Sequence, residues 1–160
     1  MTTAKFTGGC QCGAVRFAAQ RLGRASICHC RMCQKAFGSA FGPFVIVHGL
    51  TWTRGAPKHF QSSNMAKRGF CADCGTPLTY EVEGAIDIAI GALDRPAEIM
   101  PTIQLAKEVR MRWLDTLADL PTPSDEETAE LSDFYSAVRS YQHPDHDTSS
   151  WTGVQRGDKS

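Results

Sequence analysis

Seven cysteines stand in three short groups whose spacing is typical of metal ligands. The groups are C-x-C, C-x-C-x-x-C and C-x-x-C, formed in chain order by Cys10 and Cys12, by Cys28, Cys30 and Cys33, and by Cys71 and Cys74. Thiolates at such spacings are favoured zinc ligands. An odd number of cysteines also leaves one unpaired in any complete disulfide scheme. We therefore interpret the cysteines as metal ligands and not as disulfides.

The first and last groups together predict a closed zinc site. In an extended strand, alternate side chains point the same way, so the sulfurs of Cys10 and Cys12 can both reach one ion. The C-x-x-C of Cys71 and Cys74 is typical of a zinc knuckle, and Gly75 permits the positive φ that such a turn often needs. Four thiolates leave no open coordination position, so we expect this zinc to be structural.

The middle group predicts a second zinc of a different kind. Cys28, Cys30 and Cys33 offer three ligands, and three protein ligands with an exchangeable fourth are typical of reactive zinc. If Cys28-His29-Cys30 is extended, the imidazole lies on the other face and could meet substrate. If the chain turns here, His29 becomes the fourth ligand of a closed site. We take these four residues as the candidate catalytic residues.

An open zinc at the middle group would suit one reaction class. Zinc deprotonates a bound thiol and polarises a carbonyl oxygen, so the addition of a thiol to an aldehyde is the chemistry to expect. Such an addition needs no redox cofactor. The coordination sphere distinguishes the two readings of His29, because only the open site leaves a position for substrate.

Strand signals dominate residues 1–120, which hold all seven cysteines, whereas residues 121–160 look like a helical extension and tail. Several runs either alternate apolar with polar residues or are rich in aromatic and β-branched residues, and Gly, Pro or Asn separates them. These runs are GAVRFAA, FGPFVIV, KHFQSS, TPLTYEV and AIDIAIG. These runs predict a mainly β, mostly antiparallel domain. We expect a helical turn at RMCQKAF and a longer helix at IQLAKEVRMRWLDTL.

The C-terminal extension has a clear helix start. Ser124 and Glu127 form a capping box. One apolar stripe then recurs at helical spacing, on a helix that ends before Pro144, and is formed by Leu131, Phe134, Tyr135 and Val138. We expect this stripe to pack on the β domain, with a partner-binding helix as the alternative. The tail is polar, and we expect His143 and His146 to be solvated.

Charge and hydropathy narrow the classes of function. The 17 Lys and Arg residues balance the 17 Asp and Glu residues, and the pI is about 6.9. No excess positive charge therefore exists to hold nucleic acid. The first residues lack a basic region followed by an apolar run, and no stretch approaches the roughly 18 apolar residues of a membrane span. We expect a cytoplasmic protein that binds neither nucleic acid nor membrane and whose thiols stay reduced.

Three motifs hold all seven cysteines: GGCQCGAVRF at 8–17, CHCRMCQKAFGSAF at 28–41 and GFCADCGTPLTY at 69–80. In order and spacing they resemble the signature of the glutathione-dependent formaldehyde-activating family, also called the CENP-V/GFA domain. The resemblance extends over about residues 5–115, with Trp113 near a position where the family often has tryptophan. It implies the β-tent (Mss4-like) fold, a structural zinc at the four-cysteine group and a second zinc at the three-cysteine group.

The resemblance also implies an activity, the condensation of glutathione with formaldehyde to S-(hydroxymethyl)glutathione by a carbon–sulfur lyase. Glutathione or another small thiol and formaldehyde or a related aldehyde are thus the expected partners. The substrate depends on pocket residues outside the motifs. The stretch TIQLAKEVRMRW is also more polar than the strand-like segment usual in the family.

Glutathione carries two carboxylates, and arginine binds carboxylates well through its bidentate fork. The basic residues nearest the cysteine motifs are Arg31, Lys35, Lys67 and Arg68. We expect all four to be solvated surface charges. The alternative to an enzyme is a non-catalytic zinc module that docks a protein through its sheet or C-terminal helix. A thiol redox switch is disfavoured, because no βαβ context surrounds the C-x-x-C.

Overall fold

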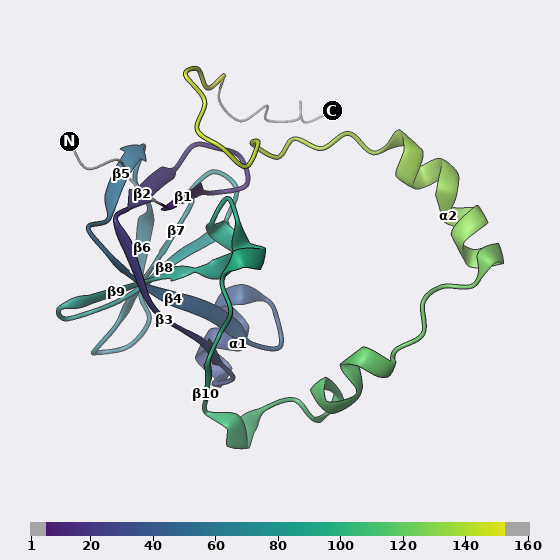
Figure 1. The fold of residues 1–160 in the computed structure, drawn as a ribbon, viewed down its shortest axis with the longest axis horizontal. Helices are drawn as coiled ribbons and strands as arrows, with labels where there is room; N and C mark the ends of the chain where they lie inside the picture. Colours follow the sequence, from purple (N-terminus) through teal and green to yellow (C-terminus); the bar gives the residue numbers. More distant parts are fainter. Residues whose placement is uncertain (1–5, 153–160) are drawn as a thin grey trace.

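Two β-sheets form the body of the protein (Figure 1). The computed structural model describes residues 6–152. The smaller sheet has the strand order β1 (Phe6–Gly9), β2 (Arg16–Ala19), β5 (Thr51–Arg54). The larger sheet has the order β10 (Ile103–Leu105), β3 (Arg21–Cys28), β4 (Gly42–His48), β9 (Ala85–Ala89), β8 (Pro77–Val82), β7 (Lys67–Phe70), β6 (Lys58–Gln61). Neighbouring strands are antiparallel except for the parallel pair of β10 and β3. The expected mainly β, mostly antiparallel fold with a C-terminal helix is confirmed.

One apolar cluster joins the two sheets. Phe17 of the smaller sheet and Val45, Leu78 and Ile88 of the larger sheet are almost completely buried in it. Because side chains alternate along a strand, Phe44 points to the opposite face of the larger sheet from Val45. There Phe44 meets Phe37 of the helix α1 (Arg31–Phe37), with ring centroids 5.0 Å apart. The larger sheet therefore has a core face and a second face that carries α1.

The structure differs from the expected elements around residues 103–117. The predicted long helix is wrong: β10 lies there, followed by the 3-10 helices η3 (Lys107–Val109) and η4 (Arg112–Asp119). Parallel pairing with β3 satisfies the backbone of β10, and Ala106 has a left-handed φ of 53° that separates the strand from η3. Helical structure is found where the turn was expected at RMCQKAF, but it is longer than one turn: α1 has 7 residues. Two further 3-10 helices, η1 (Ile90–Ala92) and η2 (Pro96–Glu98), follow β9.

The C-terminal helix α2 (Asp125–Ala137) begins as predicted but does not pack as predicted. The Glu127 amide donates to Ser124 Oγ at 3.2 Å, and the Ser124 amide donates to Glu127 Oε2 at 2.8 Å, so the capping box is confirmed. The apolar stripe, however, is exposed, with Phe134 65% accessible. The expected packing on the β domain is therefore wrong, whereas the helix ends at Ala137, before Pro144 as predicted.

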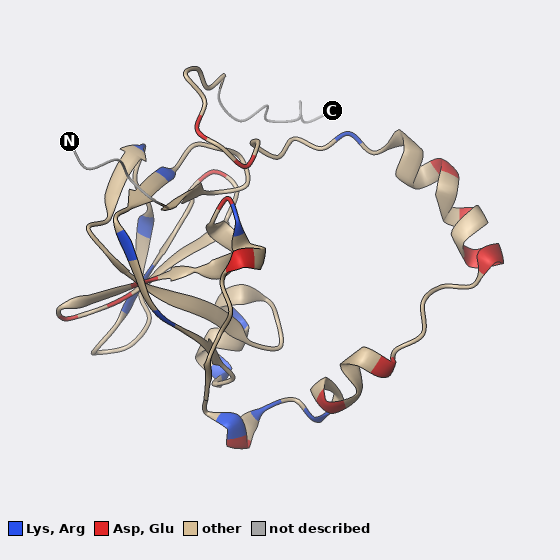
Figure 2. Cartoon of the chain, viewed as in Figure 1, with Lys and Arg blue, Asp and Glu red and all other residues tan. Residues whose placement is uncertain are grey.

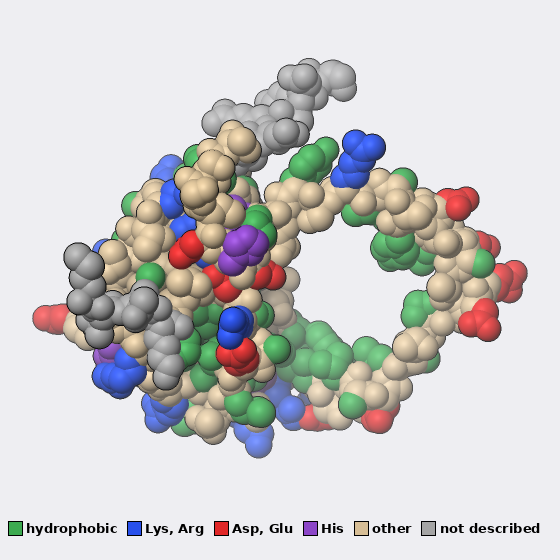
Figure 3. Space-filling model, turned by 45° about the horizontal axis from the view of Figure 1, so that its top comes forward, with side chains coloured by type: hydrophobic (Ala, Val, Ile, Leu, Met, Phe, Trp, Pro, Cys, Tyr) green, Lys and Arg blue, Asp and Glu red, His purple; other side chains and the backbone are tan. Residues whose placement is uncertain are grey.

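The exposure of α2 follows from the course of the chain. We call residues 113–138, which include most of η4 and all of α2, the arm. The arm leaves the body after β10, runs in a wide arc and returns toward β1 (Figure 1). Figure 3 shows apolar side chains on the side of the arm that faces the body and acidic side chains on its outer side.

Charge is distributed unevenly between body and arm (Figure 2). Residues 1–112 contain fourteen Lys and Arg against seven Asp and Glu, whereas the arm contains seven Asp and Glu and no Lys or Arg. The net charge of zero thus hides a basic body and an acidic arm. Within residues 6–152, no helix has both the length and the apolar character needed to cross a membrane.

Candidate metal centres

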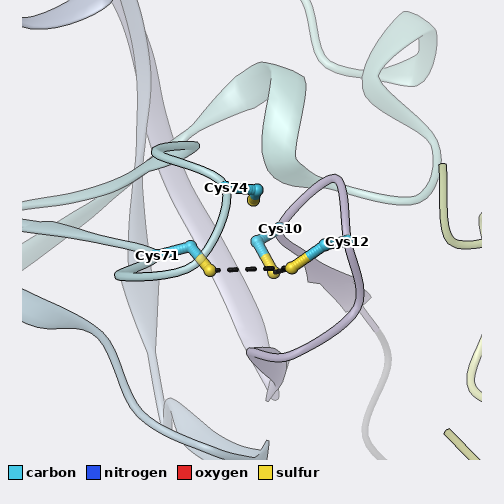
Figure 4. Close-up of side chains that lie close together, drawn as sticks. All are labelled: Cys10, Cys12, Cys71 and Cys74. Carbon is cyan, nitrogen blue, oxygen red and sulfur yellow. Dashed lines mark hydrogen bonds between the residues drawn. The ribbon is translucent and has the colours of Figure 1, made fainter. Parts of the chain in front are cut away.

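The four-cysteine group lies where two loops meet (Figure 4). Cys10 and Cys12 follow β1, and Cys71 and Cys74 follow β7, so the two sheets contribute one loop each. All four sulfurs lie within 4.8 Å of one another. The Sγ atoms of Cys10 and Cys12 are 3.5 Å apart, and those of Cys12 and Cys71 are 3.8 Å apart. Four sulfurs about 2.3 Å from one tetrahedral zinc would lie about 3.8 Å apart, so the group has the size that zinc needs.

Turns, not strands, orient these cysteines. The expected extended conformation of Cys10-Gln11-Cys12 is wrong: the segment forms a turn in which the Gly13 amide donates to the Cys10 carbonyl at 3.1 Å. Gly13 has a φ of +78°, which closes this turn. The second loop is a turn as predicted. Gly75 has a φ of +77°, and its amide donates to the Cys71 carbonyl at 2.9 Å.

The thiols of the four-cysteine group differ in how readily they ionise. Burial raises the pKa of Cys71 to about 11 and also raises the pKa of Cys12. Burial opposes ionisation of Cys74 too, but hydrogen bonds with Thr76 outweigh it and lower the pKa of Cys74 to about 6. Four clustered thiols cannot all ionise without a cation, because their negative charges repel one another. The donor set therefore suits a metal ion.

The C-terminal tail covers the loop that carries Cys10 and Cys12. The His143 amide donates to the Gln11 carbonyl at 2.7 Å, and the Trp151 indole N–H donates to the Cys12 carbonyl at 2.9 Å. The His143 ring lies so close to Gly13 that a Cβ there would be 2.2 Å from its Cδ2 atom. The expectation of a solvated His143 is therefore wrong, whereas His146 is exposed.

A buried arginine anchors the same tail. Arg16 donates from Nη1 and Nη2 to the two carboxylate oxygens of Asp94 at 2.8 and 2.7 Å, and from Nε and Nη2 to Asp147 Oδ1 at 3.0 and 2.7 Å. The side chains of Arg16 and Asp94 are almost completely buried, and Asp147 belongs to the tail. The tail thus contacts the body. The expected boundary at residue 120, between the zinc-binding domain and the C-terminal extension, stays a prediction.

The three-cysteine group lies at the start of α1. Cys28 ends β3, Cys30 is the N-cap residue of α1, and Cys33 lies in the first turn of the helix. Their sulfurs lie within 4.8 Å of one another. Burial raises the pKa of Cys33 to about 12, although Arg68 opposes this shift. Burial also opposes ionisation of Cys30, but hydrogen bonds with the backbone of Cys33 and Met32 help to lower its pKa.

His29 lies between two of these cysteines, yet its side chain turns to a neighbouring strand. Its Nε2 atom is 3.0 Å from Gln104 Oε1, and its amide donates to the Leu105 carbonyl at 3.0 Å, both in β10. The residue is only 2% exposed, and its Nδ1 atom has no hydrogen-bond partner. Among residues 6–152, no His, Asp or Glu joins the three sulfurs. This geometry favours the reading in which His29 is not a ligand, and its catalytic role stays a prediction.

Arg68 is a residue that the sequence interpretation misplaced. It was expected on the surface but is only 8% exposed. Its Nη2 donates to Cys33 Sγ at 3.4 Å and its Nε donates to Ser62 Oγ at 3.1 Å. Arg31, Lys35 and Lys67 are exposed as expected. One signal in the sequence could have indicated this burial. In a strand, adjacent Lys67 and Arg68 point to opposite faces, so both cannot be exposed on the same face.

Comparison with known proteins agrees with the motifs. The model of the family described as "Glutathione-dependent formaldehyde-activating enzyme" matches residues 5–108. No curated protein matches the chain. A crystal structure of a Rhodobacter sphaeroides protein is similar, with 22% sequence identity and a TM-score of 0.49, and the match covers 61% of this chain and 98% of that chain. Because the family model matches well over half of the sequence, this chain belongs to the glutathione-dependent formaldehyde-activating enzyme family.

Proposed function

We propose that the protein is a carbon–sulfur lyase that condenses a small thiol, such as glutathione, with formaldehyde or a related aldehyde. The reaction adds the thiol across the carbonyl: a C–S bond forms, the π pair of the C=O bond moves to oxygen, and the thiol proton ends on that oxygen. No electron is transferred, so the reaction needs no redox partner. Because it consumes reduced thiol, we place it in the cytoplasm.

One observation supports the three-cysteine group as the reaction centre. Cys28, Cys30 and Cys33 bring three sulfurs together, and no fourth His, Cys, Asp or Glu ligand joins them within the described part of the chain. We propose that they hold a zinc ion with one exchangeable position, and that Cys10, Cys12, Cys71 and Cys74 hold a structural zinc. Zinc, when bound, supplies the Lewis acidity that acidifies a thiol and polarises a carbonyl.

We assign His29 a positioning role beside the reaction centre. Its contact with Gln104 fixes the ring, and its buried Nδ1 has no partner among the described residues. Its backbone carbonyl accepts from Gln34 Nε2 at 2.8 Å, which ties the segment between Cys28 and Cys30 to α1. The contact of the imidazole with Gln104 and the bond from Gln34 to the His29 carbonyl can therefore help to hold the geometry of the three sulfurs.

Exchange spectroscopy can test the proposal. We expect the wild-type zinc protein to accelerate the exchange between glutathione and S-(hydroxymethyl)glutathione, measured by NMR at equilibrium. Cys30→Ser should stay folded and lose most of this acceleration, and His29→Ala should keep its zinc and lose part of it. If the wild-type protein gives no acceleration, and if glutathione and other small thiols leave a cobalt-substituted site spectrally unchanged, the proposal is wrong.

A second candidate function is a non-catalytic zinc module that binds a protein. The observation that favours it is the exposed apolar stripe of α2, formed by Leu131, Phe134, Tyr135 and Val138. Exposed apolar stripes of this kind are frequent at protein interfaces. This function requires metal but no exchangeable ligand, so the cobalt experiment above separates the two candidates.

A further inference from the structure

Arg68 is a buried cation without a carboxylate partner. None of the ion pairs among the described residues includes it, and only 8% of the residue is exposed. Burying a guanidinium without a counter-ion is costly in free energy. A buried arginine is therefore expected to face an anion. The group that it contacts is the sulfur of Cys33, 3.4 Å from Nη2, which becomes anionic when this cysteine binds a metal ion.

The position of this cation is fixed by its surroundings. Its guanidinium lies over the Tyr80 ring, 4.9 Å from the ring centroid, and its Nε donates to Ser62 Oγ. Arg68 and Tyr80 are register partners in β7 and β8, so the sheet itself sets the stacking. Tyr80 in turn meets Phe44 at 5.8 Å between ring centroids, on the face of the sheet that carries α1. The charge is thus held beside the three-cysteine group.

Part of the hydrogen-bonding capacity of Arg68 is unused. Two buried side-chain polar atoms in the described residues have no partner: Nη1 of Arg68 and Nδ1 of His29. Arg68 directly contacts one cysteine of the three-cysteine group, and His29 lies between the other two. Buried polar atoms are nearly always paired in folded proteins, so the unpaired Nη1 of an arginine that contacts Cys33 indicates a place where a ligand of the three-cysteine group can bind.

The charge of Arg68 can compensate the negative charge of a zinc ion with its thiolate ligands. Three thiolates around a divalent zinc carry one net negative charge, and a fourth thiolate from substrate would raise it to two. A buried positive charge beside the group offsets one of these charges, and its effect is strong because water is excluded. A neutral ligand in the same position would add no charge and would gain little from Arg68.

We propose that Arg68 is the residue that allows the three-cysteine site to accept an anionic fourth ligand, the thiolate of a small thiol substrate. The inference rests on the proposed function, because it requires an exchangeable position at Cys28, Cys30 and Cys33. Arg68 acts here as a positioning and charge-compensating residue. Its positive charge makes the exchangeable position prefer an anionic ligand to a neutral one. The cysteines themselves do not create this preference.

The test compares an anionic with a neutral probe on the cobalt-substituted protein. Azide is an anion across the neutral pH range, imidazole is neutral above its own pKa, and 2-mercaptoethanol represents the substrate thiol. Their affinities are measured by titrating the cobalt absorption bands at pH 8. For Arg68→Met we expect azide and 2-mercaptoethanol to bind about 10- to 100-fold more weakly, with imidazole affinity changed less than about twofold.

Three further variants make the comparison specific. Arg68→Lys keeps the charge and should retain azide affinity within about threefold, whereas Arg68→Gln should behave like Arg68→Met and replaces it if the methionine variant does not fold. The matched control is Lys67→Met on the same strand, whose Nζ pairs with Glu81 Oε2 at 3.1 Å, and it should bind all probes like the wild type. Circular dichroism and metal content verify that each variant is folded and loaded.

Each outcome has a defined meaning. Equal azide affinity in Arg68→Met and wild type would overturn the role of Arg68 and leave the proposed function standing. An equal loss of azide and imidazole affinity would also overturn it, because that pattern indicates a merely structural residue. If the wild-type cobalt site binds none of the three probes, the exchangeable position is absent, and the proposed function and this inference are both wrong.

Discussion

At the residue scale, the two cysteine groups differ in where they lie and in what surrounds them. The four-cysteine group joins loops from both sheets, so a metal there links Cys12 with Cys71, which lies 59 residues further along the chain. The three-cysteine group lies within one short segment from the end of β3 to the first turn of α1. Metal binding at the first group therefore contributes more to folding than metal binding at the second.

This difference predicts unequal effects of single ligand substitutions. Cys71→Ser removes a ligand that crosslinks the two sheets, so we expect a molten or insoluble protein. Cys30→Ser should stay folded and bind about one zinc equivalent less, since α1 and β3 are held by other contacts. Thermal unfolding followed by circular dichroism, together with zinc content by mass spectrometry, measures both effects. Equal melting temperatures for the two variants would contradict the division between a structural and a second site.

The cysteine spacing made both groups predictable, because ligand spacing is a local property of the sequence. Arg68 was not predictable in the same way, since its burial depends on the pairing of β7 with β8 and on the arrival of Cys33 from another part of the chain. The turn at Cys10-Gln11-Cys12 was also missed. A C-x-C segment is short enough to bring both sulfurs together in a strand or in a turn, and the sequence does not distinguish the two.

At the element scale, the helix starts that depend on neighbouring residues were predicted correctly. The errors concern strands, because their pairing partners lie far away in the sequence. The capping box at Ser124 and the start of α1 depend on neighbouring residues and were predicted. The segment 103–117 was expected to be helical, but its first residues pair with β3 from more than 70 positions earlier. Strand β3, RLGRASIC, carries little alternation and was missed, although it pairs with both β4 and β10.

The composition of the C-terminal tail did not indicate its role. It has the polar composition of a loop, yet it donates to the carbonyls of Gln11 and Cys12 and supplies Asp147 to Arg16. These contacts hold the turn that carries half of the four-cysteine group. The tail contacts add to the hydrogen bonds that Gln11 and Gly13 form with Thr76 and Arg54, so we expect the tail to slow the loss of metal from that group.

This role predicts faster zinc release when the tail contacts are removed. Truncation after Ser140 should speed transfer of zinc from the four-cysteine group to a chelator severalfold. Trp151→Phe deletes only the indole N–H donor, and a loss of about 1 kcal/mol corresponds to about fivefold. Release is followed by chelator absorbance, and the matched control is Phe134→Ser in the exposed stripe of α2, which should release zinc like the wild type. Unchanged release from the truncated protein would show that the tail does not support the site.

At the scale of the whole molecule, a neutral composition conceals two oppositely charged parts. The expectation that no excess positive charge exists to hold nucleic acid was drawn from net charge alone, and net charge does not report how charges are distributed along the chain. Residues 1–112 are basic and the arm is acidic (Figure 2). The arm stays exposed between its two connections to the body, with its apolar side chains on the side that faces the body (Figure 3).

Opposite charge on a tethered arm predicts that the dimensions of the molecule depend on salt. The screening length is about 30 Å at 0.01 M salt and about 3 Å at 1 M, so the body attracts the arm strongly only at low ionic strength. We expect a smaller radius of gyration by small-angle X-ray scattering at 0.01 M than at 1 M salt. Removing four of the seven acidic charges of the arm with Glu126→Gln, Glu127→Gln, Glu130→Gln and Asp133→Asn should weaken this dependence, and glutamine at 127 preserves the capping box. A wild-type radius that is the same at both salt concentrations would mean that the arm is held in place by contacts other than charge.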